Sequence, residues 1–167
     1  GARVKGITVE TRLNYDGRLQ VAAGLTYQSS KYNTAVNNSD ALNPKKEFLR
    51  TPTTYGYATA TYTPNQKFKT ALNLVYTGKM DVLHLASDLN LANDEYFKSP
   101  NFFNLGIKTS YNFELEKLDS NIEFFVGVKN LFDAYQTNFD VGKERDSNFI
   151  YGPANPRTYT LGFKIFK

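Results

Sequence analysis

The chain has 167 residues, a net charge of +4 and no cysteine. This length suits one domain or part of a larger one, and the missing cysteines exclude disulfide bonds, thiolate nucleophiles and cysteine metal sites. The positive charge is weak and spread over polar loops, so nucleic acid is not an expected partner. No apolar run approaches the ~20 residues of a transmembrane helix. The mean hydropathy of −0.48 still fits a membrane barrel, whose strands send only every second side chain toward lipid.

Alternation of apolar and polar residues runs along the chain and predicts an all-β fold. The alternating segments are residues 7–15, 19–27, 54–63, 68–77, 103–113, 122–129 and 159–165. Successive side chains of a strand point to opposite faces, so each segment has one apolar and one polar face. We therefore predict about seven strands of about ten residues each, in a single partial domain that covers residues 1–167.

The connections between these segments alternate in length. Short turns are expected at residues 16–18, 64–66 and 114–120, and the first contains Asp-Gly, a strong hairpin signal. Long polar loops are expected at about residues 29–52, 79–100 and 136–156. Short turns at one end and long loops at the other are typical of bacterial outer-membrane barrels. We therefore predict a transmembrane antiparallel β-barrel with its short turns and its C-terminus in the periplasm.

A soluble β-sandwich or lipocalin-like barrel would also alternate, with its apolar face inward. The membrane barrel is favoured because charged residues occur on the polar face and tyrosines occur at strand ends, where an interfacial girdle would lie. These tyrosines are Tyr15, Tyr27, Tyr62, Tyr76 and Tyr111.

Several stretches resemble a known family. Residues 126–136 read VGVKNLFDAYQ and residues 142–166 read GKERDSNFIYGPANPRTYTLGFKIF, and they follow FLRTPTTYGYATATYTP and LVYTGKMDV. In this order they resemble the C-terminal part of TonB-dependent outer-membrane receptors of the Bacteroidetes type. The residues that carry the two main motifs are Asn130, Leu131, Phe132, Asp133, Tyr151, Gly152, Pro153, Pro156 and Arg157.

The resemblance implies a 22-stranded barrel that holds an N-terminal plug and imports a scarce nutrient such as cobalamin, haem or a siderophore. Seven strands would be the last third of that barrel. The partners it implies are outer-membrane lipid, the nutrient, the TonB complex through a region outside this chain, and in some systems a surface lipoprotein. It implies no cofactor. The terminal aromatic residue of such barrels would fall at Lys167, whereas Phe166 lies one position earlier. Either the natural chain continues beyond Lys167 or its end is trimmed.

The alternative is a small stand-alone outer-membrane barrel of eight strands with an adhesion or anchoring role. It needs one further strand, which would lie within residues 33–42 or 140–150. Seven strands do not make a complete bacterial barrel of the usual even-numbered type.

Aromatic residues and the single histidine in the long loops are the candidate nutrient contacts, because stacking surfaces on outward loops suit such ligands. They are Tyr32, Phe48, His84, Tyr96, Phe97, Phe139, Phe149 and Tyr151. The competing interpretation is packing among the loops for the aromatic residues and a solvent-exposed position for His84.

Three acidic residues of the last loop, Asp140, Glu144 and Asp146, could bind calcium or could pair with Lys143 and Arg145. Arg157 is expected to anchor that loop through bidentate hydrogen bonds. A histidine without partners at ligand spacing does not predict a metal site, and no motif predicts an enzyme.

Overall fold

The computed structural model describes residues 1–87, 90–116 and 119–167. Its strands are β1 (Ala2–Tyr15), β2 (Leu19–Val36), β3 (Lys45–Glu47), β4 (Thr54–Tyr62), β5 (Phe68–Thr77), β6 (Asp81–His84), β7 (Glu95–Lys98), β8 (Phe102–Leu115), β9 (Ser120–Lys129) and β10 (Thr158–Phe166). In this part of the chain no helix is long and apolar enough to cross a bilayer.

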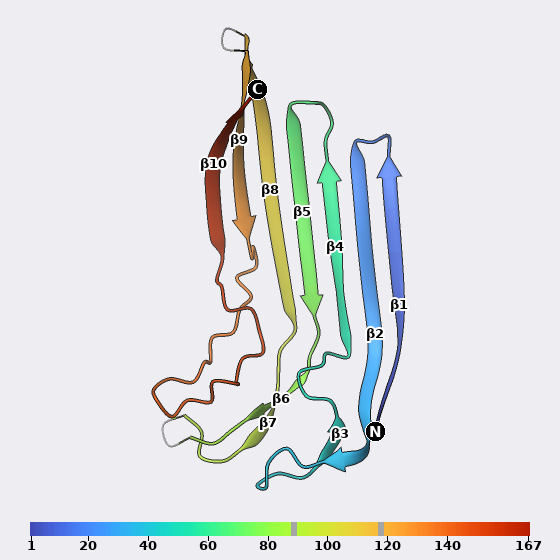
Figure 1. The fold of residues 1–167 in the computed structure, drawn as a ribbon, viewed down its shortest axis with the longest axis vertical. Coiled ribbons are helices and arrows are strands. Elements are labelled where there is room, and N and C mark those ends of the chain that lie inside the picture. Colours follow the sequence, from blue (N-terminus) through green and yellow to red (C-terminus); the bar gives the residue numbers. More distant parts are fainter. Residues whose placement is uncertain (88–89, 117–118) are drawn as a thin grey trace.

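Seven long strands form one antiparallel sheet in the order β1-β2-β4-β5-β8-β9-β10 (Figure 1). The short strand β3 adds to β2, and β6 and β7 form a separate two-stranded sheet at the end where the long loops gather. The predicted all-β fold with about seven antiparallel strands is confirmed. The strands β1 and β10 are the two edges of the sheet, and the chain begins at the loop end and finishes at the short-turn end.

The strand register gives the sheet one apolar and one polar face. One row of paired residues crosses all seven strands on the apolar face: Leu13, Val21, Ala60, Leu72, Ile107, Val128 and Tyr159. A parallel row crosses the polar face: Asn14, Gln20, Thr61, Ala71, Lys108, Gly127 and Thr160. Because a slip of one residue would exchange the faces of a strand, seven strands in matching register are strong evidence that one face is built for an apolar environment.

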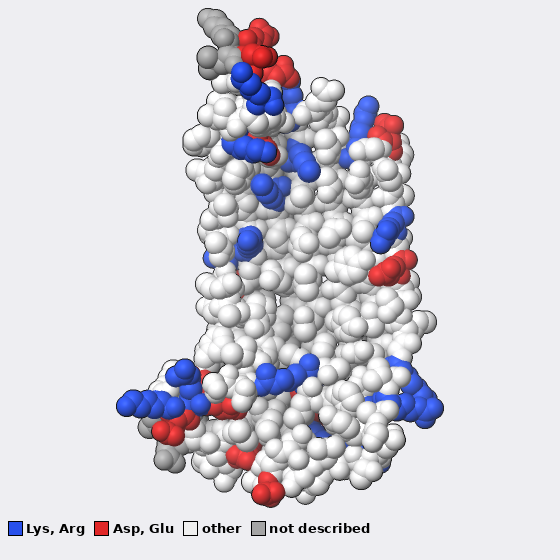
Figure 2. All heavy atoms as spheres, viewed as in Figure 1, with Lys and Arg blue, Asp and Glu red and all other residues white. Residues whose placement is uncertain are grey.

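Aromatic side chains border the apolar face at both ends. Tyr15, Tyr62 and Tyr111 lie toward the short turns, and Tyr27 and Tyr76 lie toward the long loops. On β5 the apolar face runs from Phe68 to Tyr76. This length of strand is about 27 Å, comparable to the ~25 Å apolar band of a membrane barrel. Figure 2 shows charged side chains at the loop end and over the half of the visible face toward the short turns, with a band free of charged side chains between them.

The first hairpin confirms the Asp-Gly signal. Arg18 N donates to Tyr15 O at 3.0 Å, and Asp16 and Gly17 have φ values of 51° and 65°. Positive φ at both central residues is the type I′ geometry, which matches the twist of the strands. In the second predicted turn, Asn65 Oδ1 accepts hydrogen bonds from the backbone of Lys67 and Phe68, both at 2.9 Å. In the third, residues 117 and 118 lie outside the described residues.

Two loop predictions need correction. The loop expected at residues 29–52 begins later, because β2 continues to Val36 by pairing with the start of β1 and with β3. That extension is mostly polar and does not alternate regularly, so it carries no alternation signal. The loop expected at residues 79–100 contains the hairpin of β6 and β7, while its residues 88 and 89 lie outside the described part. Neither proposed position of an eighth long strand holds one: residues 140–150 contain no strand, and residues 33–36 belong to β2.

Candidate functional site

The long connections fold together at one end of the sheet (Figure 1). We call residues 37–53, 78–87, 90–101 and 130–157, which form three segments, the loop cap. Several hydrogen bonds join its three segments. Arg50 N donates to Asp81 O at 2.7 Å, Arg50 Nη1 donates to Ile150 O at 3.3 Å, and Leu85 N donates to Asp146 Oδ2 at 3.1 Å. The candidate site is therefore a packed unit, and its exposed surface is shaped by all three segments.

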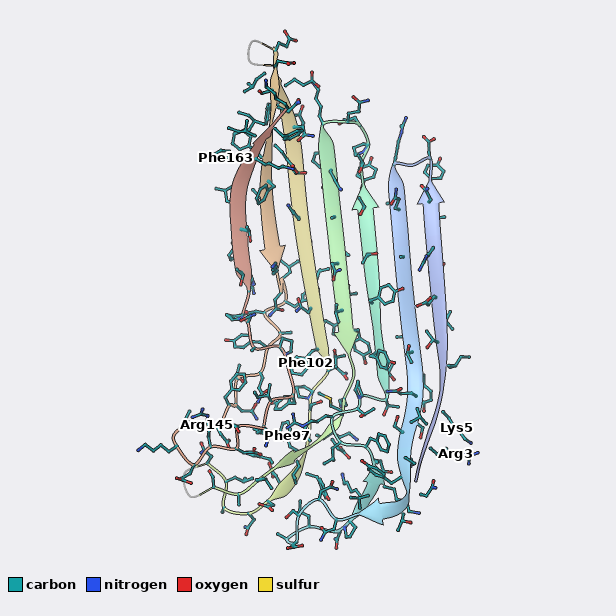
Figure 3. All side chains as sticks on the ribbon, viewed as in Figure 1. Arg3, Lys5, Phe97, Phe102, Arg145 and Phe163 are labelled. Atoms are coloured by element: carbon teal, nitrogen blue, oxygen red, sulfur yellow. The ribbon has the colours of Figure 1, made fainter. Side chains whose placement is uncertain are left out.

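The loop cap has its own apolar core. Val82, Phe102, Phe149 and Tyr151 are buried, and Phe97 packs against them. The ring of Phe97 meets Phe149 edge-on, with centroids 5.4 Å apart, and lies 4.9 Å from the ring of Tyr151. Figure 3 labels Phe97 in the cap and Phe102 where β8 enters it. Edge-to-face aromatic pairs add to the stabilisation that comes from burial alone.

His84 is the last residue of β6, and it is buried. Its ring stacks on Phe149 with centroids 3.6 Å apart, and its Nε2 lies 2.9 Å from Asp140 Oδ1. On the other side of the ring, Nδ1 lies 3.7 Å from Glu95 Oε1. The expectation of a solvent-exposed histidine is therefore wrong. Apolar burial holds the ring against Phe149, and Asp140 hydrogen-bonds to its Nε2.

Gln136 is a further buried residue at the centre of the cap, and it is only 1% exposed. Its Nε2 donates to Phe149 O at 2.9 Å, and its Oε1 accepts from Tyr151 N at 2.8 Å. The side-chain amide thus pairs with the loop backbone as a neighbouring strand would. This matters because a buried backbone group without a partner costs free energy.

The Tyr151-Gly152-Pro153 stretch closes the cap onto the sheet. The hydroxyl of Tyr151 is bonded to Asn138 Oδ1, and burial raises the pKa of Tyr151. A Cβ on Gly152 would collide with the ring of Phe102, so glycine allows this close approach. Gln136 N donates to Pro153 O at 2.9 Å.

The Asn130–Asp133 stretch follows β9 directly. Its side chains form hydrogen bonds to the residues that precede β10. Asn130 is buried with φ of 52°, and its side chain bonds the backbone of Ala134 and Asn155. Asp133 Oδ1 accepts from Arg157 N at 2.7 Å. Leu131 N donates to Leu105 O at 2.8 Å, whereas Phe132 is largely exposed.

The structure gives Arg157 a different role from the predicted one, because Arg157 binds Asp133 through its backbone. The observed anchor of Arg157 is its backbone N–H, and its side chain hydrogen-bonds to Tyr159. The prediction that its guanidinium forms bidentate bonds to the last loop is therefore wrong. Pro156 completes this corner, where its carbonyl accepts from Thr158 Oγ1 at 3.2 Å.

The first and second segments of the cap are joined by polar contacts. Lys45 Nζ lies 2.6 Å from Asp81 Oδ2 and 4.3 Å from the ring centre of Tyr96. Asp94 accepts hydrogen bonds from the backbone N–H of Ala86 and the hydroxyl of Ser39. These bonds hold the pKa of Asp94 below its usual value, with the Ala86 bond the larger cause.

Most of the predicted contact residues are used in packing. Phe97, Phe149, Tyr151 and His84 form the centre of the cap, and the ring of Tyr32 lies 4.4 Å from that of Phe48. The hydroxyl of Tyr96 donates a hydrogen bond to Asn43 O at 3.1 Å. Phe139 remains well exposed, at 40%. Sequence reasoning missed the exposed apolar residues Leu85, Val141 and Ile150, because isolated aliphatic residues in a polar loop carry no pattern.

Two of the three acidic residues proposed for calcium, Asp140 and Asp146, have other partners. Asp140 accepts from His84 and from Asp146 N, and Asp146 accepts from Leu85 N and Asn148 N. No group of three or more metal-ligating side chains occurs among the residues that the structure describes. The hydrogen bonds of Asp140 and Asp146 therefore account for the positions of these two carboxylates.

Comparison with known proteins adds to this picture. No protein-family profile and no curated protein sequence matches the chain. Among solved structures, the ferric-catecholate import receptor Fiu of E. coli K12, in its closed form, matches 99% of this chain with a TM-score of 0.68 and 21% identity. The ferric citrate transporter FecA, in its unliganded form, also matches 99% with a TM-score of 0.63 and 21% identity. This chain spans 21% and 24% of the lengths of those two proteins.

Both matched proteins are TonB-dependent receptors, the family that the sequence motifs resemble. At this level of identity the comparison establishes the fold. The sheet has the architecture of part of the barrel in those receptors, and the predicted fold class is confirmed.

Proposed function

We propose that this chain is part of the barrel wall and loop cap of a TonB-dependent outer-membrane receptor that binds and imports a scarce nutrient. One observation carries the proposal: the apolar face is continuous across all seven strands and is bordered by aromatic residues at both ends. A wall of this kind satisfies its backbone groups through the sheet and offers its side chains to lipid.

The two ends of the sheet suit the two sides of such a membrane. Tight turns close β1–β2 and β4–β5, whereas the loop cap covers the opposite end. Outer-membrane barrels have short periplasmic turns and long extracellular loops. The cap is therefore proposed to face the cell exterior, and the C-terminus is proposed to lie in the periplasm.

Iron chelates are the first nutrients to test, with cobalamin and haem next, because the two matched receptors handle ferric catecholate and ferric citrate. Phe139 in the cap and Tyr32 near the end of β2 are the most exposed of the predicted contact residues. Contact with the TonB complex, and with a surface lipoprotein if the system has one, would involve parts of the protein outside these residues.

The deciding experiment uses the native protein from its source cells. Outer-membrane fractions are separated on a gel with and without boiling, and the protein is detected with an antibody against the loop cap. A heat-modifiable band several-fold heavier than 18.9 kDa is expected. Deletion of the gene should then reduce growth on one iron chelate, and re-expression should restore it. A band confined to the soluble fraction would contradict the membrane assignment, and a heat-modifiable band near 18.9 kDa would contradict a large receptor.

A further inference from the structure

Basic residues continue the apolar side of β1 and β2 toward the loop end. Ile7 and Tyr27 are paired across these strands and are the last residues of the apolar face there. The next residue of β1 on this face is Lys5, and the one after it is Arg3, which pairs with Lys31 of β2. Side chains two residues apart share a face and lie about 7 Å apart. All three cations therefore point to the side that the proposed function assigns to lipid, and Figure 3 labels Arg3 and Lys5 at the loop end of β1.

We call Arg3, Lys5 and Lys31 the basic cluster. Arg3 and Lys31 lie directly opposite each other, and like charges in such a pair destabilise an antiparallel sheet. Lys31 is offset by Glu47, whose Oε1 lies 2.9 Å from Lys31 Nζ. Arg3 and Lys5 are exposed, and neither forms an ion pair with a carboxylate in the described part of the chain. The cluster therefore keeps an excess of positive charge, which a bound anion would offset.

A cavity of about 290 Å³ lies beside the basic cluster, at the point where β3 has ended and β4 has not begun. Its lining includes Lys31 and Glu47, which are paired on the apolar side of the sheet, so the cavity reaches that side. Ser29, Thr51 and Thr53 also line it and carry hydroxyl groups. Because a hydroxyl group can both donate and accept a hydrogen bond, this cavity suits the polar part of a lipid headgroup.

The position of the cluster matches the border between hydrocarbon and water. Tyrosine rings are favoured at this border, and Tyr27 occupies it on β2. Lysine and arginine just beyond the border attract anionic headgroups over about one Debye length, roughly 8 Å at physiological salt. A strand that continued the barrel beyond β1 would pair with the backbone edge of β1 and would leave this face open.

We propose that the basic cluster binds the phosphate group of a membrane lipid on the cap side of the bilayer. Arg3 and Lys5 donate to the phosphate oxygens, and guanidinium geometry suits a bidentate contact there. The acyl chains lie along the apolar face beyond Ile7 and Tyr27, and the rest of the headgroup lies at the cavity. The inference rests on the proposed function for its membrane location. It goes beyond that function, because it assigns a lipid site that is separate from the nutrient contacts of the cap.

The test uses the full-length protein, purified in detergent from outer membranes, and native mass spectrometry. Dioctanoylphosphatidic acid is the probe, dioctanoylglycerol supplies the acyl chains without the phosphate, and inorganic phosphate supplies the anion without the chains. The unmodified protein should bind phosphatidic acid more tightly than either of these two controls. The double variant Arg3→Gln/Lys5→Gln should weaken the tightest phosphatidic acid binding at least about tenfold, because each basic residue near a membrane surface adds to the attraction for anionic lipid. Glu47→Gln should strengthen that binding, because it releases Lys31 from its ion pair.

Arg12→Gln/Lys69→Gln is the matched control, because it removes one arginine and one lysine from the opposite, polar face of the sheet. It should leave the tightest phosphatidic acid binding unchanged, and heat modifiability on gels should show that each variant is folded. Equal weakening by this control pair, or unchanged binding in the Arg3→Gln/Lys5→Gln variant, would overturn the proposal. Phosphatidic acid binding no tighter than that of inorganic phosphate or dioctanoylglycerol would overturn it as well, and so would weaker binding in Glu47→Gln. All these outcomes leave the membrane location and heat modifiability of the receptor intact, so they are distinct from failure of the proposed function.

Discussion

The imidazole of His84 lies flat against the ring of Phe149, with the two planes only 6° apart. His84 ends β6, and Phe149 belongs to the last segment of the loop cap. The stack joins two segments that are far apart in the chain, and the nearby bond from His84 to Asp140 joins them again. The cap is therefore held from within by a buried polar and aromatic cluster.

Replacing His84 should loosen the last cap segment while the sheet stays intact. His84→Ala removes the stack and leaves the Asp140 carboxylate, whose side chain is 5% exposed, without its ring partner. A local destabilisation of about 2–4 kcal/mol is expected, because a buried polar group loses its hydrogen bond and a cavity forms. Hydrogen exchange of residues 136–151 in the full-length protein should accelerate, while β5 and β8 are unaffected. Phe139→Ala, at an exposed ring, is the control, and equal exchange in both variants would contradict the assigned role of His84.

Gln136 should be the most sensitive polar residue of the cap. Gln136→Leu keeps the approximate volume but strips Phe149 O and Tyr151 N of their partners. Each buried group left unsatisfied costs about 1–3 kcal/mol. The Tyr151 amide should then exchange hydrogen much faster. Gln136→Glu is the informative companion, because it keeps an acceptor for Tyr151 N but buries a carboxylate against the carbonyl oxygen of Phe149. A loss of stability at least as large as that of leucine is expected, and a fully stable glutamate variant would contradict this account.

The strands could be predicted from the sequence, but the interior of the cap could not. Alternation is a local signal, so residues 103–113 or 159–165 reveal their two faces directly. The contact between His84 and Asp140 depends on how three loops meet, and no periodicity records it. Gln136 was missed for the same reason, since a glutamine in a polar loop gives no sign of burial. The motif resemblance marked Asn130 and Asp133, although their hydrogen bonds appear only in the structure.

Asn130 combines two requirements that variants can separate. Its φ of 52° favours asparagine or glycine, and its side chain makes bonds to Ala134 and Asn155. Asn130→Gly keeps the backbone conformation and loses the bonds, whereas Asn130→Ala loses both. Alanine should therefore destabilise the junction by about 1 kcal/mol more than glycine. Thermal unfolding of the detergent-solubilised protein, or hydrogen exchange at residues 130–134, measures the difference, and a glycine variant less stable than alanine would show that φ is unimportant here.

Neighbouring residues on β5 provide a test of which face meets lipid. Leu72 lies in the apolar row, and Asn73 points to the polar face. Leu72→Arg should destabilise the protein in bilayers by about 2–4 kcal/mol if it lies near the midplane, because a charge is placed in hydrocarbon. Asn73→Arg should be tolerated. Folding yield into lipid vesicles, followed by heat modifiability on gels, compares the two variants. The reverse order would mean that the apolar face points inward, as in a soluble barrel.

The Asp94 carboxylate should make part of the cap sensitive to acid. The backbone N–H of Ala86 and the hydroxyl of Ser39 donate to it and keep its pKa below that of an aspartate in an unfolded chain. The unfolded state therefore takes up the proton first as the pH falls. The stabilisation from Asp94 should be complete above the unfolded pKa, near 4, and should be lost as the pH falls through the lower folded value. Limited proteolysis between residues 37 and 47 with an acid-active protease, from pH 5 down to pH 2, should show increasing cleavage in that window.

Asp94→Asn should already be cleaved faster at pH 5 and should show a flatter pH response, because its amide cannot titrate. An identical acid response in the asparagine variant would assign the effect to another carboxylate, and Glu47, whose pKa is also lowered, chiefly by its bond to Lys31, would be the next to replace.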